Sequence, residues 1–283
     1  SVQMNPSHGT NSMSVKEFSR NGFVSYERVG DVGIVSLQRP PQNRLTRQVF
    51  SDIGSSVRKL VRAGIRALLI RGDGPDFCLG GDFREWRSLT THLERRERFG
   101  FSNGILNMIE SLAIPTVTAV HGRAFGGGLE LALHTDLIIA GNSATFRFPE
   151  VTLGVAPLAG GVQRVAERAG RSVATRLVML GEEIGAEEAS RLNLVTRVVA
   201  DEQLDEAALE LAKRLARGPT RAHAVTKAIL STWSASGVRA ADEVMIEQVS
   251  GLVATEDVVR GIESAAKALE NGAARPDLTF SGN

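Results

Sequence analysis

Two residue patterns divide this chain near residue 200 and restrict the folds open to it. Before that point, short runs rich in Val, Ile and Phe, as at residues 22–28, 32–38 and 116–120, alternate with apolar residues at helical spacing. After it, only the helical spacing remains. The separate helical segments are predicted at residues 203–217, 219–232, 238–254 and 256–270.

These patterns predict an α/β core over residues 15–200 and a helical region over residues 201–283. The apolar faces of the later helices need a partner, which is either the core or another subunit. Residues 1–14 are polar and contain Pro6 and Gly9, so we expect them to form a loose leader outside the fold.

The charge balance excludes several classes of partner. Lys and Arg total 33 against 32 for Asp and Glu, a net charge of +1, which is too small for a surface built around nucleic acid or anionic lipid. The longest apolar stretches, residues 112–120 and 129–141, contain Pro115, His134 and Asp136 at or near their centres. We therefore expect no membrane-spanning segment.

The cysteine and histidine residues indicate the cellular compartment of the chain and limit the metal and thiol chemistry open to it. Cys78 is the only cysteine, which excludes an intrachain disulfide and favours a reducing compartment, so we expect a cytoplasmic protein. The histidines show no metal-ligand spacing, and we assign no metal. Cys78 and His121 form a possible thiol and imidazole pair, although a small core residue and a polar strand end are the simpler interpretations.

Two glycine-bearing loops follow predicted strands. They read FCLGGD at residues 77–82 and GRAFGGGLE at residues 122–130. Both can bring backbone N–H groups close to a ligand, because glycine has no Cβ. Neither has the glycine spacing of a dinucleotide fingerprint or of a P-loop. An alternative for residues 126–128 is that the glycines only allow a helix to pack closely on a sheet.

Two glutamates stand close to these features in the sequence. Glu130 follows Gly127 by three residues, so on a helix the two share a face, and its neighbours Leu129 and Leu131 are apolar. An acid favoured by the helix dipole is the alternative for Glu130. Glu150 follows Pro149 at a predicted strand end, where an exposed loop acid is the alternative.

The resemblance to a known family rests on four segments in order. Besides the two loops, these are FPE at residues 148–150 and GGVQR at residues 160–164. Together they resemble the signature of the crotonase superfamily, most closely enoyl-CoA hydratase, over roughly residues 22–270. The resemblance implies an α/β fold built as a spiral of ββα units. It also implies a helical C-terminal region that packs subunits into homotrimers, often paired into homohexamers.

The resemblance further implies roles for particular residues. The N–H groups of Gly81 and Gly127 match an oxyanion hole for a thioester oxygen. Glu130 and Glu150 match the two glutamates of the hydratases, with Glu130 expected as the base on water and Glu150 as the proton donor to C2. The expected substrate is an acyl-CoA thioester, so coenzyme A arrives as part of the substrate and no separate cofactor is expected.

Coenzyme A contacts are also implied by the match. Leu79 and Gly81 correspond to positions near the adenine, Arg84 is the basic residue two after Asp82, and Arg44 belongs to an early CoA-contacting turn. A solvated surface arginine is the alternative for both Arg44 and Arg84.

Three departures from the family pattern separate this chain from its relatives. Leu158 and Leu79 stand where glycine and a small residue are usual, and residues 264–269 lack the usual aromatic and basic pattern before the chain runs on to Asn283. An isomerase that uses Glu150 alone, or another acyl-CoA lyase of this fold, is the nearest alternative function. A noncatalytic acyl-CoA-binding subunit is an alternative from another class.

Overall fold

The computed structural model describes residues 16–18 and 22–283, so the predicted leader at residues 1–14 lies outside the described part. Its larger sheet has seven strands in the order β1-β2-β3-β4-β5-β7-β10. The β2–β3 hairpin is antiparallel, and β3, β4, β5, β7 and β10 are parallel. The strands are β1 (Lys16–Phe18), β2 (Val24–Val29), β3 (Val32–Leu37), β4 (Ala67–Gly72), β5 (Thr116–Val120), β7 (Leu137–Gly141) and β10 (Arg197–Val199).

Helices cover both faces of this sheet. On β4, Leu68 and Ile70 join the main core with α1 (Arg47–Arg62) and α3 (His92–Glu110). Ala67 and Leu69 point to the opposite face, since side chains alternate along a strand, and pack with α8 (Leu204–Ala216). The first helix of the predicted C-terminal region therefore completes the core of the α/β part.

A smaller sheet lies over the carboxyl ends of the parallel strands. It contains β6 (Arg123–Phe125), β8 (Thr145–Arg147) and β9 (Glu183–Gly185) in that order. Helices α4 (Gly127–Leu133) and α7 (Ala186–Arg191) pack against it. The other short helices are α2 (Phe83–Trp86), α5 (Gly161–Ala169) and α6 (Arg171–Met179), with two 3-10 helices, η1 (Pro149–Leu153) and η2 (Asp201–Gln203). Glu150 was predicted at a strand end, but β8 ends at Arg147 and Pro149 begins η1.

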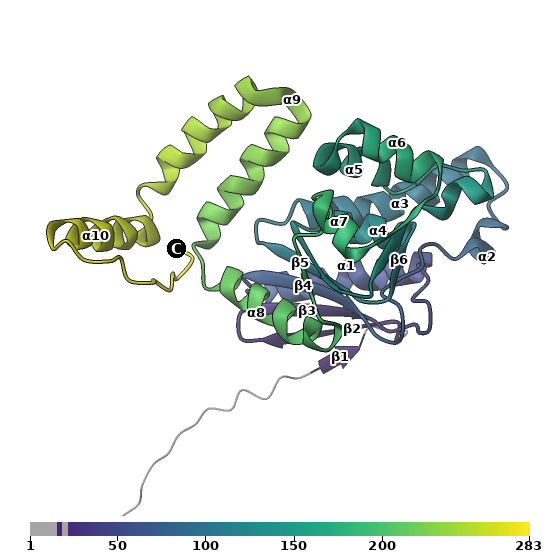
Figure 1. Cartoon of the computed structure of the whole chain (residues 1–283), viewed down its shortest axis with the longest axis horizontal. Coiled ribbons are helices and arrows are strands. Elements are labelled where there is room, and N and C mark those ends of the chain that lie inside the picture. Colours follow the sequence, from purple (N-terminus) through teal and green to yellow (C-terminus); the bar gives the residue numbers. More distant parts are fainter. Residues whose placement is uncertain (1–15, 19–21) are drawn as a thin grey trace, which may run out of the picture.

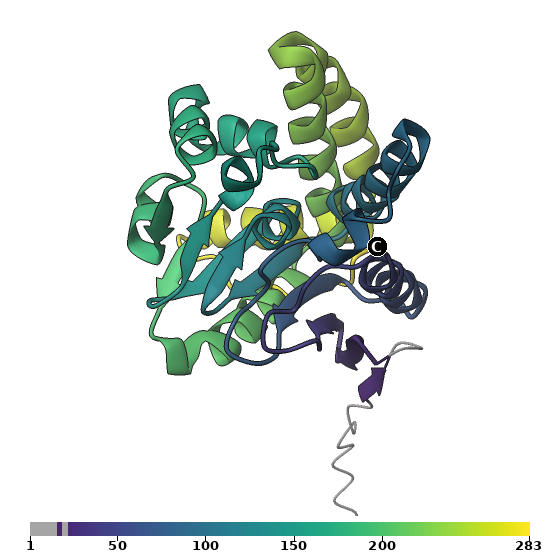
Figure 2. The same cartoon turned by 90° about the vertical axis from the view of Figure 1, so that its right-hand side faces the viewer.

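The last helices stand away from the sheets. α9 (Thr220–Leu252) bends sharply at Gly237, where φ is 82°, and this bend separates the two helices predicted at residues 219–232 and 238–254. In Figure 1, α9 rises from α8 and returns in a second arm to α10 (Glu256–Glu270). Figure 2 gives a second view in which the arms of α9 project beyond the sheet. No helix in the described residues has both the length and the apolar character that a bilayer crossing needs.

Candidate active site

Backbone pairing brings the two glycine loops together. Cys78 pairs with Ala124 through bonds from Cys78 N to Arg123 O, 3.1 Å, and from Phe125 N to Cys78 O, 2.9 Å. On its other side the first loop pairs with Leu45, whose N–H donates to Gly80 O at 2.9 Å. The first loop is therefore held between the turn before α1 and the segment that leads into α4.

Glycine is required at two points of this junction. A Cβ on Gly128 would lie 2.1 Å from Cys78 O, and a Cβ on Gly80, whose φ is +81°, would lie 2.9 Å from Gly127 N. Neither distance is possible for a real side chain. The close-packing interpretation is thus correct for Gly128, and it holds alongside the placement of amides toward a ligand.

The same pairing places the amides of Gly81 and Gly127 side by side at the pocket lining. The bridge with Leu45 uses Gly80 O and the N–H of Asp82, so the N–H of Gly81 points to the opposite side. Gly127 begins α4, and the first N–H groups of a helix have no acceptor within it. A Cβ on Gly127 would lie 3.5 Å from Gly81 N, so the two amides are neighbours.

Glu130 projects from α4 into the interior. Its side chain is 2% exposed, and its Oε1 accepts hydrogen bonds from Ala159 N at 2.8 Å and from Gly161 N at 2.9 Å. Burial raises the pKa of this carboxyl, while the two backbone N–H groups oppose that rise because they stabilise its charged form. The substitution at Leu158 therefore leaves these backbone donors in place.

Glu150 has a different environment. It lies on η1, is 7% exposed, and its Oε2 is buried without a hydrogen-bond partner among the described residues. Burial, followed by repulsion from Glu130, raises the pKa of Glu150 to about 7. The two carboxyl groups thus differ, because Glu130 has donors that favour its charge and Glu150 has a surrounding that favours its proton.

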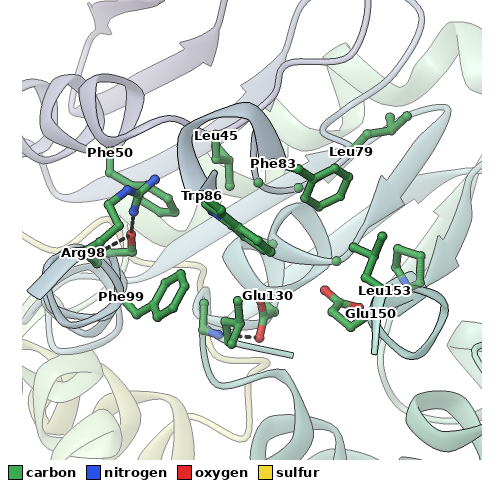
Figure 3. Close-up of a pocket in the computed structure, with 18 residues that line it drawn as sticks. Leu45, Phe50, Leu79, Phe83, Trp86, Arg98, Phe99, Glu130, Glu150 and Leu153 are labelled. Carbon is green, nitrogen blue, oxygen red and sulfur yellow. Dashed lines mark hydrogen bonds between the residues drawn. The ribbon is translucent and has the colours of Figure 1, made fainter. Parts of the chain in front are cut away.

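A mostly apolar pocket of about 580 Å³, open to solvent, contains these groups. Figure 3 shows Glu130 and Glu150 facing the same space, with Trp86 and Leu153 beside them. The Trp86 ring packs edge-to-face on Phe99 at 5.7 Å and would lie 2.8 Å from a Cβ on Gly81. The pocket is lined by Leu45, Phe50, Leu79, Gly80, Gly81, Phe83, Trp86, Arg98, Phe99, Ser102, Gly126, Gly127, Glu130, Pro149, Glu150, Leu153, Leu158 and Ala159.

Sequence reasoning did not identify the wall formed by Trp86, Arg98 and Phe99. Arg98 is buried and pairs with Glu85 of α2 at 2.9 Å. The carboxylate of Glu85 also accepts from Arg47 N at 3.0 Å. The signal available was a tryptophan shortly after the first glycine loop, but a helical pattern alone does not tell a pocket wall from a surface residue.

The two predicted coenzyme A arginines are not among the residues that line this pocket: Arg44 lies in the turn before α1 and Arg84 lies on α2. Arg44 donates to Leu79 O at 2.7 Å, and its guanidinium lies 5.1 Å from the centre of the Phe83 ring. Arg84 is largely exposed and forms a paired contact with Asp82, with bonds of 2.8 and 2.7 Å. Both side chains therefore already have partners within the first loop region.

The thiol and imidazole pair does not form. Cys78 Sγ contacts Asn43 O at 3.1 Å, whereas His121 Nε2 contacts Gly74 O at 2.8 Å. Burial raises the pKa of Cys78 to about 12, which keeps it as the neutral thiol. Within the part of the chain that the structure describes, no group of three or more His, Cys, Asp or Glu is arranged to hold a metal ion.

The environment of Glu150 predicts a dependence of stability on pH. Its pKa is about 7 in the folded chain against a usual 4.5, so the folded chain binds the extra proton between these values. The free energy of unfolding should therefore fall as pH rises through this window, by about 3 kcal/mol in total. Glu150→Gln stays neutral, so urea unfolding should show it gaining stability relative to wild type from about pH 5 to about pH 8. A difference that is constant over this range would contradict the buried titration.

Comparison with known proteins shows which family this chain resembles over most of its length. Residues 27–268 match the family described as enoyl-CoA hydratase/isomerase. "Probable enoyl-CoA hydratase 2, mitochondrial" of Arabidopsis thaliana is 33% identical over 262 residues, which cover 89% of this chain and 85% of that protein. The "Short-chain-enoyl-CoA hydratase" of Clostridium acetobutylicum is 32% identical over 195 residues, covering 68% and 74%.

The fold agrees as well. The crystal structure of an enoyl-CoA hydratase from Bacillus anthracis matches with a TM-score of 0.81 at 27% identity and covers 92% of this chain and 100% of that chain. The predicted crotonase-like α/β fold with a helical C-terminal region is therefore confirmed. With a family match over most of its length and relatives above 30% identity, this chain belongs to the enoyl-CoA hydratase/isomerase family.

Proposed function

We propose that this chain is an enoyl-CoA hydratase, a hydro-lyase that adds water across the 2,3-double bond of an acyl-CoA thioester. The observation that carries the proposal is a pair of buried carboxyl groups in one apolar pocket whose lining also includes Gly81 and Gly127. The names of the relatives support the same reaction. An isomerase needs one proton-transferring acid, so the second buried carboxyl favours hydration.

The proposed mechanism assigns one role to each group. Glu130, in its charged form, which its two backbone donors stabilise, takes a proton from water as the oxygen attacks C3. The electrons of the double bond move toward the thioester oxygen, where the N–H groups of Gly81 and Gly127 stabilise the enolate. Glu150 then gives its proton to C2. Water is thereby added, and proton exchange returns Glu130 to the charged form and Glu150 to the neutral form.

The rim of the pocket supports the proposed binding of coenzyme A, which is part of the substrate. Leu79 and Gly81 line the pocket at its border with the first loop. Arg44 and Arg84 lie beside this border and carry the nearby positive charge. We therefore keep these four residues as proposed contacts of the coenzyme A portion, with the arginines meeting its phosphates by exchanging part of their present contacts.

Labelled water tests the reaction directly. Enoyl-CoA thioesters of several acyl lengths are incubated with the chain in water enriched in oxygen-18, and the masses of the products are measured by mass spectrometry. Hydration places the heavy oxygen in the product. A product of unchanged mass with a moved double bond would identify an isomerase, and binding without conversion would identify a noncatalytic subunit.

We further propose that the helical region joins subunits into a homotrimer or homohexamer. Large apolar side chains on α9, at its C-cap and on α10 are exposed in the single chain, including Val238, Ile246, Val253 and Ile262 at 55–64%. Contact with another subunit would remove them from water. Leu204, in contrast, is buried against the sheet and takes no part in such a contact.

Light scattering should report an assembly at micromolar concentration. Ile246→Asp combined with Val253→Asp should shift the mass toward the monomer, because a charge buried in an apolar interface is strongly unfavourable. Leu93→Asp is the matched control, since Leu93 is 63% exposed but lies at the start of α3. A monomeric wild-type chain would contradict the assembly.

For the compartment, we retain the cytoplasm as the proposal. The single cysteine is a buried free thiol, which suits a reducing environment. The Arabidopsis relative carries a mitochondrial name, so fractionation of cells that express the full protein would decide between the two compartments.

A further inference from the structure

We propose that Asn103 is a positioning residue that orients the Leu158–Ala159 peptide so that its N–H group holds the carboxylate of Glu130. The inference rests on the proposed function in one respect, because it is Glu130 that would activate water. Asn103 lies on α3, outside the residues that line the pocket. It would therefore act on the reaction only through the loop between η1 and α5.

The contact geometry carries this inference. Asn103 Nδ2 donates to Leu158 O at 2.9 Å, and the N–H of the same peptide unit, on Ala159, donates to Glu130 Oε1 at 2.8 Å. One peptide plane thus has its carbonyl fixed from α3 and its N–H directed at the carboxylate. Asn103 Nδ2 also donates to Phe99 O at 2.9 Å. Since both acceptors are carbonyls, the amide nitrogen must face them, which fixes the orientation of this side chain.

The Gly160–Gly161 peptide, two units further along the loop, is held in the same way. Arg164 Nη1 donates to Gly160 O at 3.2 Å, and the N–H of that unit, on Gly161, donates to Glu130 Oε1 at 2.9 Å. Arg164 is itself anchored on α3 through Glu110, with Nε to Oε1 at 2.9 Å. In both peptides that donate to Glu130, the carbonyl oxygen therefore accepts a hydrogen bond from a side chain, Asn103 in one and Arg164 in the other.

This support matters because the loop has little regular structure of its own. Residues 155–160 contain no helix or strand, and Gly160 has a φ of 88°. A peptide plane in such a loop can rotate unless its carbonyl is held. A hydrogen bond to the carbonyl oxygen of a peptide also polarises that peptide, and this strengthens the hydrogen bond that its N–H group donates. Removal of Asn103 should weaken the bond from Ala159 to Glu130.

Asn103 is the better residue to test because it carries no charge. The charged and titratable groups around Glu130 are Glu150 on η1, Arg164 on α5, Glu110 on α3 and His134 at the end of its own helix. Replacing Arg164 would alter this electrostatic surrounding directly. Replacing Asn103 leaves each of these charges in place and changes only the peptide that donates to the carboxylate.

The first measurement is the pH profile of kcat/KM for hydration of a short enoyl-CoA thioester. Asn103→Ala should move the acidic limb to higher pH by about one unit, because a carboxylate that loses an N–H donor binds a proton more readily. Below that limb the rate should fall about tenfold while KM changes little. Asn103→Leu is close to asparagine in size and has neither a donor nor a charge, so it should shift the limb in the same direction if the alanine variant folds poorly.

Asn107 provides the matched control. It is an asparagine one turn further along α3, and its Oδ1 contacts Arg164 Nη2 at 3.3 Å without contacting the Leu158 peptide. Asn107→Ala should leave the limb within a few tenths of a pH unit of wild type. If Asn103 has only a structural role, its variants will lose thermal stability but keep the wild-type profile, and the positioning role is then wrong.

A second measurement does not depend on activity. Carbon-13 NMR of chains labelled at the glutamate carboxyl follows the titration of Glu130, with Glu130→Gln used to assign its signal. The pKa of Glu130 should rise by about one unit in Asn103→Ala. A rise without any hydration by the wild-type chain would support the positioning role and overturn the proposed function. Hydration with an unchanged Glu130 titration would overturn the positioning role alone.

Discussion

Glu130→Gln and Glu150→Gln are each expected to lower kcat by at least about a hundredfold with little change in KM. The reason is that proton transfer by these groups stabilises the transition state and contributes little to ground-state binding. At position 130 the amide oxygen of glutamine can still accept from Ala159 N and Gly161 N, so the fold of the loop should be retained. Stopped-flow measurement of thioester hydration gives both constants.

The control for this pair is Glu97→Gln, which makes the same chemical change on an exposed position of α3. It should retain wild-type kcat. The two outcomes for the buried pair separate the mechanisms. If Glu130→Gln remains fully active and Glu150→Gln does not, water addition by two carboxyl groups is wrong and an isomerase becomes the better description.

Gly127→Pro is expected to lower kcat/KM by about a hundredfold to a thousandfold, the usual effect of removing one oxyanion donor. Proline has no N–H group, and the first position of a helix is the one where it is best tolerated. Gly127 occupies that position in α4. Circular dichroism and thermal melting should confirm that the variant folds before its rate is measured.

Gly127→Ala is the companion variant, because it restores the N–H. Its methyl group would meet its nearest neighbours, Leu45 and Gly80, at an ordinary 3.4 Å, so it should be at least about tenfold more active than the proline variant. Gly81 is less suitable, since a methyl group there would lie 2.8 Å from the Trp86 ring. Equal rates for folded Gly127→Pro and Gly127→Ala would mean that this amide does not bind the developing enolate.

The order of elements could be predicted from the sequence because it depends on local periodicity. The alternating strands around Gly30, the apolar face of α1 and the helices after residue 200 all reflect spacings within a few residues. The glycine loops and the two glutamates were assigned to the site through the resemblance to a known family, from motifs in a fixed order. The structure places Gly81, Gly127, Glu130 and Glu150 in one pocket.

The environment of each group was decided only by contacts between distant segments. The donors to Glu130 come from 29 and 31 residues away, and the support of the Leu158 peptide comes from Asn103, 55 residues away. Periodicity carries no information on such pairs, because they depend on how the loop before α5 lies against α3. The same holds for Trp86 against Gly81. The sequence by itself thus determined which side chains can carry the chemistry. Tertiary packing decided how each carboxyl group is surrounded: burial raises the pKa of both, and two backbone donors from the loop before α5 oppose that rise at Glu130.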